Sequence, residues 1–281
     1  MVVTGFPLKN GRFMEILDLE DSSFNCTTKV KFPINVYSAT GGLVEHTPIV
    51  CGGTIRESDG RDMGCLTKGL ISKCCFSLQD NGTWTKEKPL ITPRYLAAVG
   101  SVVMKKKLVI AGGQARHKLG ETYLLPSMEM VSLTTGASME IVVSGMWIWI
   151  PPIRSCIVKW DANTVLVIGG QDQPYRSEGK KETYFVHLNN NTVTNGPILQ
   201  HKRHSHACHE MTVGGEEYIV VTGGSVGGGP YSWGHQKVMS TEILSKSSYK
   251  NGWKGGKNWS QARMKTLIFA LGLPPIHVQG G

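Results

Sequence analysis

The segments LVIAGG (Leu108–Gly113) and VLVIGG (Val165–Gly170) decide the fold of this chain. Each is a run of aliphatic residues that ends in two glycines. A continuously apolar strand is typical of a position covered on both faces of a sheet, and paired glycines allow positive φ and a close backbone approach where the strand ends. The landmark recurs every 48 to 60 residues, in runs that end at Gly5, Gly53, Gly224 and Gly281.

The residues between these landmarks also recur in phase. A strand that carries a glutamate follows the glycines, as in Phe13–Leu17, Ser127–Val131 and Ser240–Leu244, and Tyr123 and Tyr184 stand at the head of that strand. Another short strand precedes each pair of glycines, so each unit predicts four strands in a meander. One four-stranded sheet cannot bury both of its faces, whereas sheets stacked radially around an axis can.

This pattern resembles the kelch repeat, in which each unit forms one blade of a β-propeller. The resemblance covers nearly the whole chain and is strongest in the units that end at Gly113, Gly170 and Gly224. It implies an all-β protein with a single propeller domain over residues 1–281. We expect four complete four-stranded blades at about 36–86, 94–143, 154–198 and 204–259, with partial blades at 1–31 and 263–281. Four complete blades with a partial blade at each end fit either an incomplete six-bladed ring, in a chain that is a fragment, or a distorted five-bladed ring.

Composition excludes several classes of protein. Hydrophobic residues make up 40% of the chain and charged residues 18%, which suits a chain that buries a core. No apolar run reaches the roughly 18 residues that a membrane-spanning helix needs. Aromatic residues do not alternate with basic ones at stacking intervals. We therefore expect neither a membrane span nor a nucleic-acid partner.

Positive charge concentrates in particular loops. In an antiparallel blade, the connections between strands 2 and 3, and between strand 4 and the next strand 1, emerge on one face. These loops together carry more positive charge than the whole chain, whose formal net charge is +9. Such a face favours an acidic partner and salt-dependent binding. The alternative is that lysine and arginine are simply common in loops.

Four residues are our candidate contacts on that face. Arg116 and Arg176 lie in two of the expected loops, and the glycine-rich loop 225–237 carries Tyr231 and Trp233. Aromatic and arginine side chains are enriched at interface hot spots. In the alternative arrangement, Trp233 folds back on its own blade. We expect a non-enzymatic binding or scaffold module whose partner is a protein, acidic or glycosylated, with a glycan as the alternative partner.

The cysteines and the Asn-X-Ser/Thr sequons bear on the compartment. Cys51 lies in an expected second strand and Cys74-Cys75 in the third strand of the same blade. Adjacent residues point to opposite faces of a strand, so only one of the two can face Cys51; Cys51 with Cys75 is the candidate disulfide, and buried free thiols are the alternative. The sequons favour a secreted protein over a cytoplasmic one. Candidate glycosylation sites are Asn25, Asn81, Asn190 and Asn258.

Catalysis has little support in this sequence. Nucleophile-elbow, P-loop and zinc-protease motifs are absent, and we expect no cofactor and no metal. His204 and His206 have the spacing of a chelating pair on a strand, but Arg203 with His206 also matches the structural Arg-x-x-His of many kelch units. The propeller superfamily includes copper-radical sugar oxidases, so a copper-dependent sugar oxidase is the alternative function.

Overall fold

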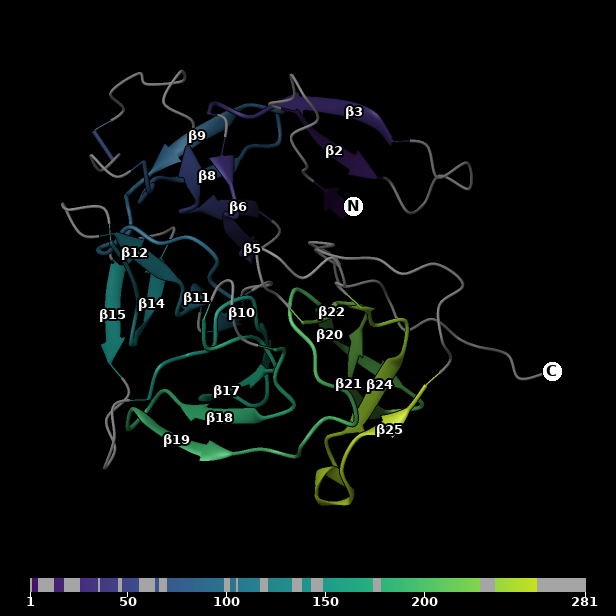
Figure 1. Ribbon diagram of the computed structural model, residues 1–281. Coiled ribbons are helices and arrows are strands. Elements are labelled where there is room, and N and C mark those ends of the chain that lie inside the picture. Colours follow the sequence, from purple (N-terminus) through teal and green to yellow (C-terminus); the bar gives the residue numbers. More distant parts are fainter. Residues whose placement is uncertain are drawn as a thin grey trace.

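The computed structural model describes residues 2–4, 13–17, 26–34, 36–44, 47–55, 64–65, 70–98, 102–104, 106–116, 121–132, 138–142, 149–173, 178–227 and 236–256. Within these residues the chain is all-β, apart from the 3-10 turn Tyr249–Asn251. Four four-stranded antiparallel sheets are arranged as a β-propeller (Figure 1). The predicted fold class is therefore confirmed. No helix in the described part of the chain has the length and apolarity that a membrane span requires.

The four complete sheets follow one another in sequence, and we call them blades 1 to 4. Blade 1 consists of β5 (Thr40–Val44), β6 (Thr47–Cys51), β8 (Cys75–Leu78) and β9 (Trp84–Glu87). Blade 2 consists of β10 (Val102–Met104), β11 (Lys107–Ala111), β14 (Ser127–Ser132) and β15 (Ser138–Val142). Blade 3 consists of β16 (Cys156–Lys159), β17 (Thr164–Ile168), β18 (Thr183–His187) and β19 (Thr192–Asn195). Blade 4 consists of β20 (Ala207–Val213), β21 (Glu216–Thr222), β24 (Thr241–Ser245) and β25 (Lys254–Gly255).

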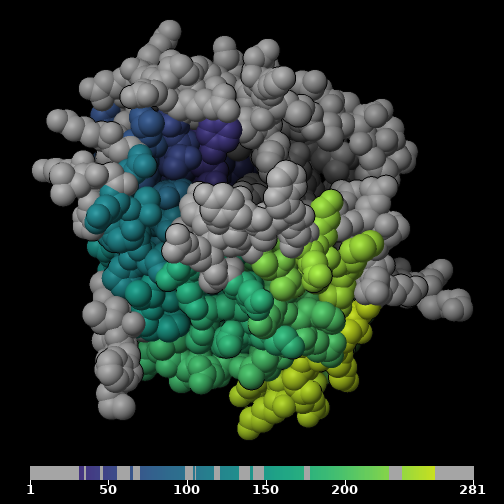
Figure 2. Space-filling view, in the orientation of Figure 1, coloured from purple at the N-terminus to yellow at the C-terminus, as the bar shows by residue number. Residues whose placement is uncertain are grey.

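A three-stranded sheet precedes blade 1. It is formed by β1 (Val2–Thr4), β2 (Phe13–Leu17) and β3 (Cys26–Lys31), in that order. The partial blade expected at 263–281 lies outside the described residues. First strands such as β5, β10 and β20 lie near the centre of the molecule, and β9, β15, β19 and β25 lie at its periphery (Figure 1). The blades follow one another around the molecule from blue through teal and green to yellow (Figure 2).

The hydrophobic core lies between neighbouring blades, because both faces of each second strand are covered. In β11, Leu108 and Ile110 pack in the cluster shared with blade 1, whereas Val109 and Ala111 pack in the cluster shared with blade 3. The exposed fraction of these four side chains is at most 1%. Because alternate side chains of a strand point to opposite faces, one apolar run supplies core residues to the interfaces on both sides of its blade.

The paired glycines lie where consecutive blades meet. Gly113 has φ of 107°, and a Cβ built on it would lie 2.9 Å from the carbonyl oxygen of Tyr95 at the start of its own blade. Gly112 has φ of 58°, and its Cβ would lie 2.9 Å from the carbonyl oxygen of Pro151, which leads into blade 3. Only glycine combines this backbone conformation with that proximity, which explains why the landmark is a pair.

A chain of backbone hydrogen bonds links the four blades. One non-glycine residue near the start of each blade is left-handed, with φ of 52° to 54°: Ser38, Leu96, Arg154 and Ser205. The N–H of Leu96 donates to the carbonyl of Ser38, that of Arg154 to Leu96, and that of Ser205 to Arg154, at 3.2, 3.1 and 2.8 Å. Backbone strain of this kind persists when the surrounding structure enforces it, here through contact with the next blade.

In the described part of the chain, three two-stranded ribbons add to the expected meander. They are β4 (Val36–Tyr37) with β7 (Thr54–Ile55), β12 (Gln114–Arg116) with β13 (Thr122–Leu124), and β22 (Ser225–Val226) with β23 (Gln236–Lys237). They correct one prediction, because Tyr123 belongs to β13 and not to the head of the third strand. Tyr184 does lie in the third strand of its blade, β18.

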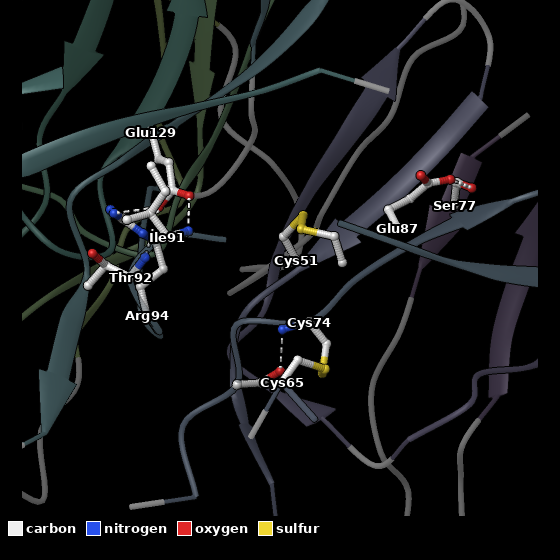
Figure 3. The surroundings of a disulfide bond; sticks show 11 residues. Cys51, Cys65, Cys74, Ser77, Glu87, Ile91, Thr92, Arg94 and Glu129 are labelled. Carbon is white, nitrogen blue, oxygen red and sulfur yellow. Dashed lines mark hydrogen bonds and ion pairs between the residues drawn. A yellow bond between two sulfur atoms is a disulfide. The ribbon is translucent and has the colours of Figure 1, made fainter. Parts of the chain in front are cut away.

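Three disulfides tie the blades internally and to each other. Cys51 is bonded to Cys75, its directly opposed partner across β6 and β8, and Cys74 turns the other way to bond Cys65 (Figure 3). The third disulfide joins Cys156 of β16 to Cys208 of β20, whose Cα atoms lie 6.0 Å apart. It therefore links the first strands of blades 3 and 4, a pairing that the sequence analysis missed because the two residues are 52 positions apart.

Candidate functional site

The connections between strands 2 and 3 and those from strand 4 to the next strand 1 lie side by side, and we call the surface they form the loop face. Between blades 3 and 4, the N–H of Leu199 donates to the carbonyl of Lys181 at 2.9 Å, and that of Arg203 donates to Lys180 at 3.0 Å. Between blades 1 and 2, the N–H of Leu90 donates to Lys73 at 2.7 Å. The loop face is therefore a hydrogen-bonded layer and a rigid platform for any contact residue on it.

A buried ion pair anchors the loop face at blade 2. The carboxylate of Glu129 on β14 accepts hydrogen bonds from the Ile91 N–H at 2.5 Å and from Arg94 Nη2 at 2.9 Å (Figure 3). Arg94 Nη1 donates to the carbonyl of Gly112 at 2.7 Å. Burial lowers the pKa of Arg94, and the charge of Glu129 opposes that shift. The guanidinium stays protonated because arginine does not lose its proton in proteins.

Blade 4 repeats this arrangement. Glu242 on β24 accepts hydrogen bonds from the Gln200 N–H at 2.6 Å, the His201 N–H at 3.1 Å and Arg203 Nη2 at 2.6 Å. Arg203 Nη1 donates to the carbonyl of Gly223 at 2.9 Å, as Arg94 does to Gly112. Burial again lowers the pKa of the arginine, against the influence of Glu242.

Blades 1 and 3 lack both members of the ion pair. The residue before Tyr37 in blade 1 is Val36, and the third-strand residue opposite Val50 is Phe76. In blade 3 the corresponding residues are Pro152 and Tyr184. The two positions are thus either both charged or both uncharged, as expected where a buried charge without its partner would be costly.

These pairs reduce the positive charge that a partner can reach. Arg94 and Arg203 lie in connections from strand 4 to the next strand 1, but both side chains are fully buried against glutamates. Lys202 pairs with Glu178 at 2.5 Å, and Lys180 with Asp172 at 2.7 Å. Burial alone would lower the pKa of Lys180, but its interactions with Asp172, Tyr184 and Glu182 raise it.

Arg116 is exposed on the β12–β13 ribbon, which extends the loop face at blade 2. Its backbone partner across the ribbon is Thr122, and the neighbouring Tyr123 is 38% exposed. The sequence placed Tyr123 at the head of a third strand and did not mark it as a contact residue. The ribbon thus presents an arginine and a tyrosine within one short hairpin.

The other three candidate contacts, Arg176, Tyr231 and Trp233, lie outside the described residues. The structure does describe the base of the loop that carries Tyr231 and Trp233. β22 and β23 pair through Ser225 with Lys237, and the carbonyl of Gly227 lies 2.8 Å from His204 Nε2. The glycine-rich loop therefore leaves from and returns to the loop face at blade 4.

The histidines have structural surroundings. His206 is 1% exposed, and burial, with the charges of Arg203 and His204, holds the pKa of its ring well below the usual range. A Cβ on Gly169 would lie 2.9 Å from its Cε1, so the ring packs against the glycine pair of blade 3. Across the described ranges, no three His, Cys, Asp or Glu side chains gather as metal ligands.

Two of the candidate glycosylation sites, Asn81 and Asn190, are exposed in the turns between strands 3 and 4 of blades 1 and 3. Asn25 and Asn258 lie outside the described residues.

No family model and no curated protein matches this chain. Among solved structures, the chain is similar to YjhT with a TM-score of 0.66 and 12% sequence identity, over 94% of this chain and 83% of that one. At this identity the similarity concerns the fold, and it supports the β-propeller architecture.

Proposed function

We propose that this protein is a kelch-type β-propeller that binds a protein partner, acidic or glycosylated, through its loop face and without catalysis. The observation that carries the proposal is the pair of ribbons, β12–β13 and β22–β23, that extend the 2–3 connections of blades 2 and 4. Loops held by a rigid scaffold are where binding residues concentrate. The recurring paired glycines support the assignment to the kelch type.

The exposed side chains on these ribbons support a partner that is polar and negatively charged. Arg116 and Lys237 are both exposed, one on each ribbon. Tyr123 adds an aromatic surface beside Arg116. Arginine and tyrosine together are frequent hot-spot residues, and exposed cations attract an acidic partner in a salt-dependent way.

We also propose that the protein works in an extracellular compartment. The three disulfides use six of the seven cysteines, and disulfides persist in oxidising compartments. The same bonds restrict the copper-oxidase alternative. A tyrosine–cysteine thioether needs a cysteine outside a disulfide, and the three bonds leave Cys26 for that role. Metal analysis of purified protein, with stoichiometric copper as the outcome that favours the oxidase, separates the two functions.

The binding proposal is tested with the immobilised protein and extracellular fluid from its source. Captured protein is identified by mass spectrometry, and its affinity for the wild type is then compared with its affinity for loop-face variants. We expect Arg116→Glu and the double variant Tyr231→Ala/Trp233→Ala each to weaken binding by at least about tenfold, because hot-spot truncations cost about 2 kcal/mol or more. Raising the salt concentration should weaken the wild-type complex.

The matched control is Lys159→Glu, a charge reversal of an exposed lysine at the end of β16 that precedes the 1–2 turn of blade 3. That turn lies at the opposite end of the strands from the loop face, so this variant should bind as the wild type does. Equal affinity of the loop-face variants and the wild type would contradict the proposed site.

A further inference from the structure

Two of the sequons occupy the same turn in two different blades. Asn81 lies between β8 and β9 of blade 1, and Asn190 lies between β18 and β19 of blade 3. Both side chains are exposed, and in both the residue two positions later is a threonine. The two turns connect strands 3 and 4, near the periphery of the propeller.

The two asparagines have the same hydrogen-bond pattern, each with the threonine of its own sequon. Asn81 Oδ1 accepts from the Thr83 N–H at 3.0 Å and from Thr83 Oγ1 at 2.6 Å. Asn190 Oδ1 accepts from the Thr192 N–H at 3.3 Å and from Thr192 Oγ1 at 2.8 Å. The threonine therefore holds the amide oxygen in both turns. No described group forms a hydrogen bond with Nδ2 of either asparagine.

The middle residue of each sequon has a left-handed backbone. Gly82 has φ of 78° and Asn191 has φ of 56°. A Cβ added at Gly82 would meet no heavy atom within 4 Å. A large substituent on the neighbouring asparagine would therefore extend into solvent without displacing the sheet.

We propose that Asn81 and Asn190 carry N-linked glycans. In the transfer, Nδ2 of the asparagine forms a bond to C1 of the first sugar of a lipid-pyrophosphate-linked oligosaccharide. The bond between C1 and the pyrophosphate oxygen breaks, the lipid pyrophosphate leaves with the electron pair, and Nδ2 releases one proton. No oxidant or reductant is involved. The acceptor sequon Asn-X-Ser/Thr is the one that N-glycosylation recognises in secreted proteins.

The location of these turns determines which surface the glycans cover. In blade 3 the N–H of Leu188 donates to the carbonyl of Asn163 at 2.8 Å, so the glycan-bearing turn lies against the 1–2 turn of the same blade. Both turns lie at the opposite end of the strands from the loop face. The glycans thus shield the far surface and leave the loop face accessible, a consequence that rests on the proposed function.

The proposal is tested by mapping glycans on the natural protein, isolated from the cells that make it. Enzymatic release of N-glycans in ¹⁸O-labelled water converts each glycosylated asparagine to labelled aspartate. Peptide mapping should find that label at positions 81 and 190. In cells that express the full gene, Asn81→Gln and Asn190→Gln should each remove one glycan-sized step in gel mobility, and the double variant should remove two.

Asn189→Gln is the control, because Asn189 is exposed in the same turn but has an asparagine two positions later. Its mobility should equal that of the wild type. Where a glutamine variant fails to accumulate, Thr83→Ala and Thr192→Ala abolish the same sequons from the other end. Unlabelled asparagine at either position, or variants without a mobility change, overturns the proposal. Mapping of the glycosylated asparagines does not depend on partner binding, so failure of the loop-face experiment leaves this test unaffected.

Discussion

Arg94 Nη2 lies 2.9 Å from a carboxylate oxygen of Glu129, and neither side chain has exposed surface. The arginine comes from the connection that leads into blade 2, and the glutamate comes from the third strand of that blade. Their contact fixes the loop face to the sheet. Because Arg203 and Glu242 repeat it in blade 4, the pair is a structural element of the repeat and not a ligand site.

Removing one member of either pair should destabilise the protein strongly. A buried charge left without its partner costs about 3–5 kcal/mol, whereas replacing both members with apolar residues costs much less. We expect Arg203→Met and Glu242→Leu each to lower the free energy of unfolding by about that amount, with a favourable coupling in the double variant. Denaturant titration of the four proteins measures it. Strict additivity would show that the pair does not act as a unit.

Blade 2 offers a comparison within the same molecule. Glu140 lies 3.9 Å from Arg94 and provides a second carboxylate when Glu129 is replaced. Glu129→Leu should therefore destabilise less than Glu242→Leu does. The opposite order would contradict the role assigned to Glu140.

Gly113→Ala should destabilise the protein more than Gly214→Ala. Both glycines are left-handed, with φ of 107° and 59°. A Cβ at Gly113 would lie 2.9 Å from the Tyr95 carbonyl oxygen, whereas one at Gly214 meets nothing within 4 Å. Backbone strain alone costs about 1–3 kcal/mol, and the clash adds to it at Gly113 only. Thermal denaturation of both variants provides the test, and equal losses would exclude the clash as the reason why glycine recurs at this position of the repeat.

The disulfide between Cys156 and Cys208 should stabilise the contact between blades 3 and 4. It closes a segment of 52 residues, and loss of a native disulfide typically costs about 2–5 kcal/mol. We expect the double variant Cys156→Ser/Cys208→Ser to unfold at a lower denaturant concentration than the wild type. The control uses a protein in which the cysteines of the Cys51–Cys75 and Cys65–Cys74 bonds have been replaced. In a thiol reductant, the denaturation midpoint of this protein should approach that of the same protein with Cys156→Ser/Cys208→Ser added. An unchanged midpoint would contradict the stabilising role.

Acid should destabilise the protein partly through His206. Burial, with the charges of Arg203 and His204, holds the folded-state pKa of this histidine well below its unfolded value. Between those two values the unfolded chain binds more protons, so the stability present above the unfolded pKa is lost as the pH falls. The contribution reaches about 1.4 kcal/mol per pH unit below about pH 6.5. His206→Phe should flatten the pH dependence of unfolding in this range, and an unchanged slope would assign it to other groups.

The recurring LVIAGG-type segments predicted the blades correctly for a local reason. A doubly covered second strand needs an uninterrupted apolar run, and the blade contact at its end needs two glycines, so one short segment carries both constraints. Strand periodicity limited the partner of Cys51 to one of Cys74 and Cys75, and the register of β6 and β8 places Cys75 opposite it. Tyr123 was misassigned because its ribbon is an extra hairpin ahead of β14, with no apolar alternation to separate the two.

The sequence by itself determined the repeat, the strand order within a blade and the propeller, because each depends on residues close together along the chain. Only the tertiary structure decided which charges are available. Arg94, Arg203 and Arg116 are all arginines in connections of the loop face. Arg94 and Arg203 are nevertheless buried against glutamates of third strands, whereas Arg116 is exposed. It also decided the Cys156–Cys208 bond. Both outcomes depend on distances between separate units of the chain, which the packing of blades sets and local sequence does not encode.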